Sequence, residues 1–445
     1  MRPIPLQDLA RLLALNHPQR ALVQGFAIDS RKIVAGDLYF ALPGNRVDGH
    51  AFLKEAAFKG AACAIVQEGY RGDSGGLPLL YVPNVLAALQ ELARIILASR
   101  PSRVIAISGS LGKTTTKEFT APLLRTRYRV FSSPLSYNSQ VTLPLSILMA
   151  QGDEEYLILE MGMSHAGHIK NLISIAPPDI ALITTIAVQH AVNFSDGLVG
   201  ISREKASLFS HAKTTLGLLH HDILHYDVVA SRGDCIKKTF SLVTQEADYF
   251  LEKISEGVRI HAKKEGFYDC CLNLPITVHH HNFLAAVALA RSLDVPWASI
   301  CEVAPTLKLP PMRFEPIEKK GILFINDAYN ANPDAMVAAL ENLPKPQTGC
   351  KIIAVLSEMD ALGDYTESGH TRVAEAALEH ADYLLCLGPR CEIMKSIWNR
   401  AQKPVELFPT RDDLSFALKA LAQPGDVVLL KGARFYALDQ LLQNW

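Results

Sequence analysis

The chain lacks any apolar run of the roughly 18–20 residues that a membrane span needs, and it has no internal repeat or low-complexity tract. Its start, MRPIPLQDLARLLAL, has apolar residues at helical spacing but no unbroken apolar stretch before a small-residue cleavage site, so we expect no signal peptide. The formal net charge is -1, so the protein has no overall positive potential that would attract nucleic acid or an anionic membrane. We therefore expect a soluble, cytoplasmic protein that holds anionic ligands at local sites.

The eight cysteines are scattered, and no pair has the C-x-x-C spacing of a zinc or redox site. Only Cys270 and Cys271 are close in sequence. We interpret all eight as reduced thiols of the protein core, as is usual in the cytoplasm.

A chain of 445 residues is too long for one hydrophobic core, because domains usually hold about 100–200 residues. The composition, with 49% apolar and 20% charged residues, is that of a globular protein. We predict three domains, at residues 1–97, 98–310 and 311–445. The first boundary follows the helical pattern VLAALQELARIILASR, which should end before Pro101.

Short apolar runs alternate with helical patterns in all three parts, which predicts an α/β protein with parallel sheets. The strand patterns of the first and middle parts are CAIV, LPLLYV, RVIAISG, YLILEMG and DIALITTIAV. The segment at about 240–275 is more irregular and rich in β-like residues. GILFINDA, KIIAVL, YLLCLG and DVVLLKG predict a doubly wound third domain.

The strongest local signal is the segment ISGSLGKTTT, residues 107–116, between an apolar strand and a helical pattern. Glycines let backbone N–H groups approach phosphate oxygens, Lys113 offsets phosphate charge, and a Thr hydroxyl can bind Mg²⁺. Ile107 stands where G-x-x-x-x-G-K-[ST] has its first glycine. The competing interpretation is a tight strand-to-helix turn with an incidental lysine, which the strand-loop-helix context disfavours.

Three further residues are candidates only beside such a loop. Glu160 closes the strand YLILE, where a second Mg²⁺ ligand usually stands. From spacing alone, His190 is an ordinary loop histidine and Lys205 a solvated helix lysine. We interpret the tract His279-His280-His281 as structural, because adjacent histidines on a helix point in different directions.

A polar segment, DAYNANPD at residues 327–334, follows the strand GILFIN and precedes a helical pattern. Its Asn side chains could form a binding loop at the sheet edge where α/β folds bind ligands. Asn, Pro and Asp are equally common as turn and cap residues, so this segment alone decides nothing.

Taken together, these segments resemble the Mur ligases, in the right order and over nearly the whole chain. SGSLGKTTT is similar to the family's phosphate loop, and DSRK, GDLYFAL and DGHAFLKEAAFKGA look like an N-terminal domain of that family. DAYNANPDAM resembles the branch that adds a D-alanyl-D-alanine dipeptide, and EMGMSHAGHI, LSEMDALGDYTESGH and LLKGAR agree. The resemblance implies a small UDP-sugar-binding domain, a central phosphate-loop ATPase domain and a C-terminal Rossmann-like domain.

The resemblance also implies an activity: ATP-dependent ligation of D-alanyl-D-alanine to UDP-N-acetylmuramoyl-tripeptide, through an acyl phosphate, for peptidoglycan synthesis. It implies ATP and two Mg²⁺ ions as cofactors, a carbamylated Lys205 and, we expect, a monomer. The sequence leaves open whether the tripeptide ends in meso-diaminopimelate or in lysine.

Site residues follow from the same resemblance. Lys113, His190 and Lys205 would be catalytic, with Thr114, Glu160, His190 and Lys205 at the metal ions. The residues implied to bind ATP are Ser108, Gly109, Ser110, Leu111, Gly112, Lys113, Thr114, Thr115, Asn282, Arg313 and Asp327. Those implied to bind the other substrates are Ser30, Arg31, Asn138, Tyr329, Asn330 and Asn332.

The chain departs from the usual family pattern at Ser136, Ser207, Val278 and Ser357. Three alternatives remain. The first is another ligase of the superfamily, such as the third-residue ligase or a folylpolyglutamate synthase, but the segment YNANP argues against both. The others are a phosphate-loop ATPase that drives a conformational change in a protein partner and a catalytically silent UDP-sugar sensor. The intact Lys113, Glu160 and Lys205 argue against the last.

Overall fold

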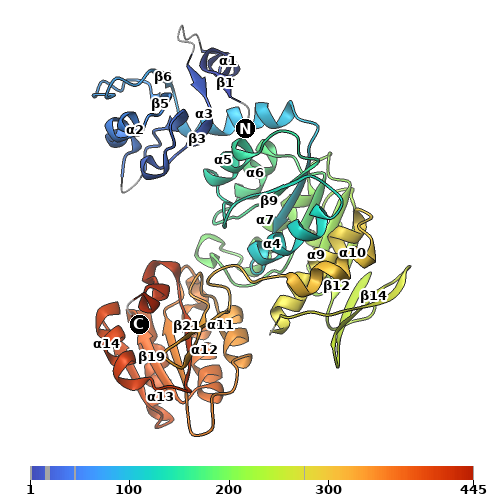
Figure 1. Cartoon of the computed structure of the whole chain (residues 1–445). Coiled ribbons are helices and arrows are strands. Elements are labelled where there is room, and N and C mark those ends of the chain that lie inside the picture. Colours follow the sequence, from blue (N-terminus) through green and yellow to red (C-terminus); the bar gives the residue numbers. More distant parts are fainter. Residues whose placement is uncertain (1–2, 16–20, 45–46, 275, 444) are drawn as a thin grey trace.

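Three α/β parts follow one another along the chain in the computed structural model, which describes residues 3–15, 21–44, 47–274, 276–443 and 445. Figure 1 shows the N-terminal and C-terminal parts at opposite ends, with the middle part between them. This confirms the predicted α/β class. None of the helices in the described ranges is both long and apolar enough to cross a membrane.

The N-terminal part is built on a parallel sheet with the strand order β3-β4-β5-β6. Its strands are β3 (Gly25–Ala27), β4 (Asp37–Phe40), β5 (Cys63–Gln67) and β6 (Leu79–Val82), with an antiparallel pair of β1 (Ile4–Pro5) and β2 (Leu22–Val23). Its helices are α1 (Leu6–Leu12), α2 (Leu53–Phe58) and α3 (Val85–Ala98).

Helix α3 joins this part to the middle one. Asn84 caps its start by accepting a hydrogen bond from the Ala87 N–H at 2.9 Å. The apolar face of α3 is buried in a core shared with β5 on one side and with α5 and α6 of the middle part on the other. After the helix ends, the Arg100 guanidinium donates to the carbonyls of Ile147 (3.1 Å) and Ala150 (3.2 Å).

The middle part has one large sheet with the strand order β15-β14-β13-β12-β11-β10-β7-β9-β8, parallel from β8 to β13. The strands are β7 (Arg103–Ser108), β8 (Val130–Ser132), β9 (Tyr156–Glu160), β10 (Ile180–Ile183), β11 (Leu216–His220), β12 (Ile236–Ser241), β13 (Tyr249–Ile254), β14 (Gly257–Ala262) and β15 (Gly266–Cys270). The helices are α4 (Lys113–Arg125), α5 (Thr142–Met149), α6 (His168–Ile175), α7 (Leu198–Ala206), α8 (Asp227–Ser231), α9 (Thr277–Ser292) and α10 (Trp297–Val303).

Strand β7 lies inside this sheet, so its side chains after Arg103 are buried on both faces. Ile105 and Ile107 face the core under α4, α9 and α10, and Val104 and Ala106 face the core under α3, α5 and α6. The predicted β-rich segment is the antiparallel run β13-β14-β15, which extends the parallel sheet at one edge. This layering brings the loop after β7 to the carboxyl edge of the sheet.

The C-terminal part has the strand order β16-β17-β21-β18-β19-β20, with an antiparallel edge strand β16. The strands are β16 (Glu315–Lys319), β17 (Ile322–Asn326), β18 (Ile352–Ser357), β19 (Tyr383–Leu387), β20 (Val405–Phe408) and β21 (Val427–Lys431); the helices are α11 (Pro333–Glu341), α12 (Thr366–His380), α13 (Glu392–Arg400) and α14 (Arg411–Leu421). One core packs under α11, α12 and α13, and a second under α14 and residues 438–442. The predicted double winding is confirmed.

The prediction of eight reduced core thiols was wrong. Cys270, at the end of β15, forms a disulfide with Cys301 in α10, which joins the sheet edge to the helix packed on it. Cys271 is exposed. Sequence spacing could not reveal this pair, because its members are 31 residues apart and meet only when α10 packs on β15.

A core substitution in the C-terminal part gives a direct stability test. Leu429 in β21 is fully buried in the same core as Trp398. We expect Leu429→Ala to lower the free energy of unfolding of this part by about 2–5 kcal/mol, because it leaves a cavity. Urea unfolding followed by tryptophan fluorescence measures it. The control Phe416→Ala removes a side chain that is 79% exposed on α14, and should change stability by less than about 0.5 kcal/mol; equal effects would contradict the packing.

Candidate active site between the middle and C-terminal parts

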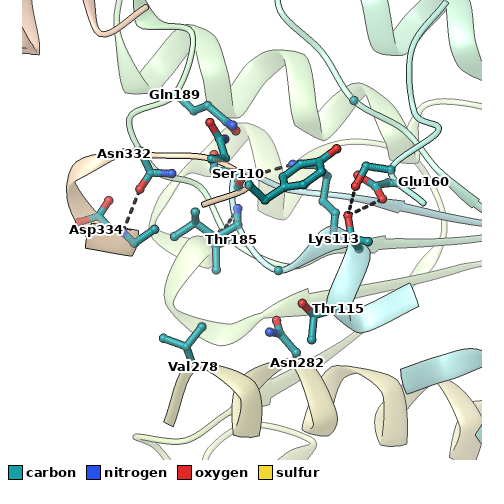
Figure 2. A pocket seen from close by; sticks show the side chains of 18 of the residues that line it. Ser110, Lys113, Thr115, Glu160, Thr185, Gln189, Val278, Asn282, Asn332 and Asp334 are labelled. Atoms are coloured by element: carbon teal, nitrogen blue, oxygen red, sulfur yellow. Dashed lines mark hydrogen bonds between the residues drawn. The ribbon is translucent and has the colours of Figure 1, made fainter. Parts of the chain in front are cut away.

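A cavity of about 770 Å³ lies where the carboxyl edge of the middle sheet meets the C-terminal part. Loops after β7, β9, β10 and β11 and the first turn of α9 line it from one side, and residues 313–314, 327–339 and Lys431 line it from the other. Figure 2 shows Lys113 and Glu160 on one side and Asn332 and Asp334 on the other, with Val278 and Asn282 projecting from α9. Both parts thus build a single site.

The loop between β7 and α4 is held by the chain that follows β10. The N–H groups of Ser110 and Leu111 donate to the backbone oxygen and the hydroxyl of Thr185, at 2.8 and 3.0 Å. Gly112 has a φ of +77°, and a Cβ there would collide with the Asn282 side chain. The first N–H groups of α4 have no partners inside the helix, so this loop presents donors and a positive helix end to an anion.

Lys113 opens α4 and folds back over the loop. Its Nζ donates to the carbonyl oxygens of Gly109 at 2.8 Å and Ser110 at 3.3 Å. Burial lowers the pKa of this amine, and the nearby Arg313 lowers it further, while Glu160 opposes the shift. An anion in the loop would favour its charged form.

Thr114 and Glu160 form the second element of the site. The Thr114 hydroxyl donates to Glu160 Oε2 at 2.8 Å and lies 2.8 Å from the Ser136 hydroxyl. Asn138 Nδ2 donates to the other carboxylate oxygen at 2.6 Å. Glu160 is 1% exposed, so a nearly buried carboxylate lies directly beside the phosphate-type loop.

Lys205 and His190 extend this cluster. Lys205 is 2% exposed, and its amine has no hydrogen-bond or ion-pair partner among the described residues. Burial and the charge of Lys113 hold the pKa of Lys205 well below its usual value. His190 has a left-handed backbone, with φ +57°, and burial together with Lys113 and Lys205 lowers its pKa to about 4. Its imidazole is therefore neutral at physiological pH.

The neighbouring Glu204 does not neutralise Lys205 directly. Its carboxylate accepts hydrogen bonds from the N–H groups of Gly167 at 2.9 Å and Ile169 at 2.7 Å, at the start of α6. Lys205 is left as a buried amine without a bonded counter-charge.

The donors fit Mg²⁺ better than a softer ion. Within the described residues, no group of three or more His, Cys, Asp and Glu side chains could hold a metal ion by itself. Mg²⁺ usually takes one or two carboxylates, with waters and substrate phosphates completing its shell. Thr114 and Glu160 supply oxygen donors of this kind next to the phosphate-type loop.

The C-terminal part reaches the loop through Arg313. Its Nη2 donates to the Thr114 hydroxyl at 3.4 Å, and its guanidinium lies 4.0 Å from the centre of the Tyr329 ring. Asp327 accepts a hydrogen bond from the Phe314 N–H at 3.2 Å and pairs with Lys431 Nζ at 2.6 Å. Asp327 therefore positions the segment that carries Arg313.

The segment at 327–334 has both roles that its sequence allows, a helix cap and a wall of the cavity. Asn332 caps α11, accepting from the Ala335 N–H at 2.9 Å, and also lines the cavity. Asn330 and Tyr329 line the cavity too, and the Asn330 carbonyl accepts from Lys431 at 3.3 Å.

Helix α9 supplies a third wall. Asn282 is buried and its Oδ1 accepts from the Thr116 hydroxyl at 3.4 Å. His279 and His281 also line the cavity, and the His281 ring lies 4.4 Å from that of His220. The histidine tract is thus partly a cavity wall, in addition to being packed in the fold.

Several expected site residues lie elsewhere. Ser108 and Gly109 precede the cavity lining. Ser30 and Arg31 belong to the N-terminal part, where Ser30 Oγ donates to Glu55 at 2.7 Å and Arg31 pairs with Asp29 at 2.8 Å. These two do not line the cavity.

The four departures from the family pattern have local roles. The Ser136 hydroxyl contacts Thr114, and Val278 packs against the C-terminal core. Ser207 directly follows α7 and donates to the carbonyl of Arg203 in that helix at 3.2 Å. The Ser357 hydroxyl accepts from the Ala433 N–H at 2.9 Å.

Sequence reasoning missed Thr185, Gln189 and Lys431, which line the cavity. Thr185 and Lys431 stand at or just beyond the carboxyl ends of β10 and β21. The rule that ligands bind at this edge of parallel sheets could have indicated them.

Comparisons with known proteins agree with this geometry. Three family models match in order: "Mur ligase family, catalytic domain" at residues 22–95, "Mur ligase middle domain" at 107–290, and "Mur ligase, glutamate ligase domain" at 312–434. The chain is 30% identical over 443 residues to the UDP-N-acetylmuramoyl-tripeptide–D-alanyl-D-alanine ligase of Bacillus subtilis (strain 168), covering 97% of this chain and 95% of that protein. The chain belongs to the Mur ligase family.

Other Mur ligases are similarly close. The ligase of the same name from Treponema pallidum (strain Nichols) is 31% identical, with 94% of this chain and 92% of that protein covered. The crystal structure of MurF ligase from Thermotoga maritima in complex with ADP has a TM-score of 0.76 and 28% identity, covering 95% of this chain and 96% of that chain.

The buried histidines of this Mur ligase predict an acid-sensitive fold. Burial lowers the pKa of His220 to about 4 and that of His281 to about 3. A folded-state pKa below the unfolded value of about 6.5 means that unfolding takes up protons as pH falls below 6.5, so stability present above that pH is lost. From pH 7 to pH 5 we expect a loss of about 1–2 kcal/mol for each of these imidazoles.

Urea unfolding of wild type and His281→Gln at pH 5, 7 and 8 tests this linkage. The variant should lose less stability between pH 7 and pH 5 than the wild type. The pair at pH 8 is the control, since the imidazole is neutral in both states there. Identical slopes below pH 6.5 would contradict a buried neutral His281.

Proposed function

We propose that this chain is an ATP-dependent amide ligase that joins D-alanyl-D-alanine to UDP-N-acetylmuramoyl-tripeptide, giving the UDP-linked pentapeptide precursor of peptidoglycan. The names of its full-length relatives support this substrate pair. The main structural support is the 3.4 Å hydrogen bond from Arg313 to Thr114. Through it, a residue of the C-terminal domain contacts the phosphate-type loop of the middle domain. We place the reaction in the cytoplasm, where ATP is available, and propose a monomer with domains at 1–97, 98–310 and 311–445.

The chemistry requires activation of a carboxylate. A carboxylate is a poor acylating agent, because its leaving group would be oxide. The tripeptide carboxylate oxygen therefore attacks the γ-phosphorus of ATP and ADP leaves, giving an acyl phosphate. The dipeptide amine then attacks the acyl carbon, and phosphate leaves from a tetrahedral intermediate as the amine loses a proton. The first step brings two anionic reactants together, and the second develops negative charge on the oxygen of the tetrahedral intermediate, so catalysis depends on positioning and charge stabilisation.

The residues of the cavity suit this task. Lys113 and the first N–H groups of α4 would hold the ATP phosphates, and Arg313 would reach them from the C-terminal domain. Thr114 and Glu160 would hold Mg²⁺, with His190 and a modified Lys205 at a second ion. When bound, Mg²⁺ would neutralise phosphate charge and orient the transferred group. Closure of the C-terminal domain would keep water from the acyl phosphate.

The other substrates have separate candidate residues. Asn282 would contact the nucleotide base, and Asp327 would act at the ATP side through Arg313. Tyr329, Asn330 and Asn332 would face the peptide end, with Asn138 on the opposite wall. Ser30 and Arg31 would bind the UDP-sugar in the N-terminal domain, outside the cavity.

A phosphate-loop ATPase that moves a protein partner is the competing function. Phosphate release measured with a matrix of UDP-muramoyl peptides and D-amino-acid dipeptides separates the two. The ligase requires both a UDP-linked tripeptide ending in lysine or meso-diaminopimelate and D-alanyl-D-alanine for full turnover. ATP hydrolysis that needs neither would refute the ligase. Lys113→Ala, as the matched inactive control, should keep its thermal unfolding temperature.

The positively charged side chain of Lys205 must become an anion if it is to bind a metal ion. A buried amine with a lowered pKa is available in its neutral form, which can attack CO₂. The amine nitrogen forms a bond to the CO₂ carbon and loses a proton, and the resulting carbamate offers anionic oxygens that suit Mg²⁺. The carbamate would also relieve the repulsion between Lys205 and Lys113.

Lys205 variants should therefore behave as enzymes that lack an anionic metal ligand. We expect Lys205→Ala to be nearly inactive and to regain part of its activity when short carboxylic acids are added. Lys205→Arg should not be rescued, because its cation still fills the space. Ligation rates with and without acetate, and native mass spectra under CO₂, measure these effects. Full activity of Lys205→Ala would remove the residue from the site.

A further inference from the structure

Lys117 is a second buried lysine of α4, one helical turn beyond Lys113, and the mechanism above does not use it. Its side chain is fully buried. Nζ donates to the backbone carbonyls of Ser133 and Leu135 and lies 3.0 Å from Glu118 Oε1. An ammonium group has three donors, and these acceptors satisfy all three. Burying such a charge is costly unless it is paired, so this arrangement fixes its neighbours tightly.

The carbonyls that Lys117 holds belong to the segment 133–138, between β8 and α5. Leu135 has a φ of +48° although it is not glycine, and its side chain is 67% exposed. A left-handed Leu is disfavoured by about 1–2 kcal/mol, and an exposed side chain contributes little packing to offset it. The hydrogen bond from Lys117 to its carbonyl is therefore a main restraint on this turn.

The same segment delivers two side chains to the candidate metal site. Ser136 contacts Thr114 at 2.8 Å, and Asn138 donates to Glu160 at 2.6 Å. Ser133 is joined to β9 as well, because its hydroxyl accepts from the Glu160 N–H at 3.4 Å. Among the described residues, Lys117 Nζ bonds to neither the Thr114 nor the Glu160 side chain but holds the segment that orients both.

We propose that Lys117 is a positioning residue for the Mg²⁺–nucleotide site, acting through the backbone of Ser133 and Leu135. The proposal rests on the proposed function only in taking Thr114 and Glu160 as metal ligands. Groups that orient ligands from outside the coordination shell have large effects, so loss of this amine should misplace the site without removing any ligand.

The chain offers a matched control in Lys403. Its Nζ donates to the backbone carbonyls of Leu378 at 2.5 Å and Ala381 at 3.4 Å, in the C-terminal domain and away from the cavity lining. Lys403→Met therefore removes the same kind of bond with no connection to Thr114 or Glu160.

The experiment measures ADP affinity by calorimetry, in Mg²⁺ and in EDTA, for full-length wild type, Lys117→Met, Lys117→Gln and Lys403→Met. We expect Mg²⁺ to tighten ADP binding to the wild type. Lys117→Met should weaken ADP binding in Mg²⁺ by roughly 10- to 100-fold while leaving the affinity in EDTA unchanged. Lys117→Gln, which keeps amide donors, should fall between these, and Lys403→Met should match the wild type.

Retention of the full Mg²⁺ effect in Lys117→Met would overturn the inference. So would an equal loss of affinity in Mg²⁺ and in EDTA, which marks a general structural role. If Lys117→Met does not fold, the same comparison with Lys117→Gln decides. If the ADP affinity of the wild type is the same in Mg²⁺ and in EDTA, the proposed metal site is refuted, and this inference is refuted with it.

Discussion

The desolvated amines of Lys113 and Lys205, which face one cavity, are the constraint on which the rest of this structure depends. Lys113, Lys205, Arg313 and Lys431 all line one cavity, together with the carboxylates Glu160, Asp222, Asp327 and Asp334. Glu160 accepts a hydrogen bond from Thr114, and Asp327 pairs with Lys431, so neither carboxylate is bonded to Lys113 or Lys205. Repulsion between these two amines and their desolvation are costly without a bound anion. The depressed pKa values of Lys113, Lys205 and His190 are the consequence. A ligand that brings several phosphate oxygens offsets these costs together.

The fold supplies this cluster from two directions. Parallel strands of the middle domain end at one edge and present Lys113 and Glu160, while the start of the C-terminal domain presents Arg313. Neither domain alone provides all of these residues. Under the proposed function, this division would couple nucleotide binding to domain closure, because Arg313 would gain a phosphate partner only when the two domains meet.

Much of this site was predictable from sequence where chemistry is local. The strand-loop-helix context identified the loop around Lys113, and the strand end identified Glu160, since both depend on neighbours in sequence. Contacts between distant segments were not predictable. Thr185 anchoring the loop, Lys117 holding Leu135, and the Cys270–Cys301 disulfide each join parts of the chain that only the packed fold brings together. The Asn332 side chain shows a third case, because a helix cap and a cavity wall have the same sequence pattern.

The central claim is that one nucleotide site is shared by the two domains. A crystal structure of the full chain with ADP and Mg²⁺ tests it most directly. We expect phosphate density against the first turn of α4, a metal ion bonded to Thr114 and Glu160, and Arg313 in contact with the phosphates or with Thr114. Nucleotide density away from this turn, or an Arg313 that points into solvent while ADP is bound, would contradict it.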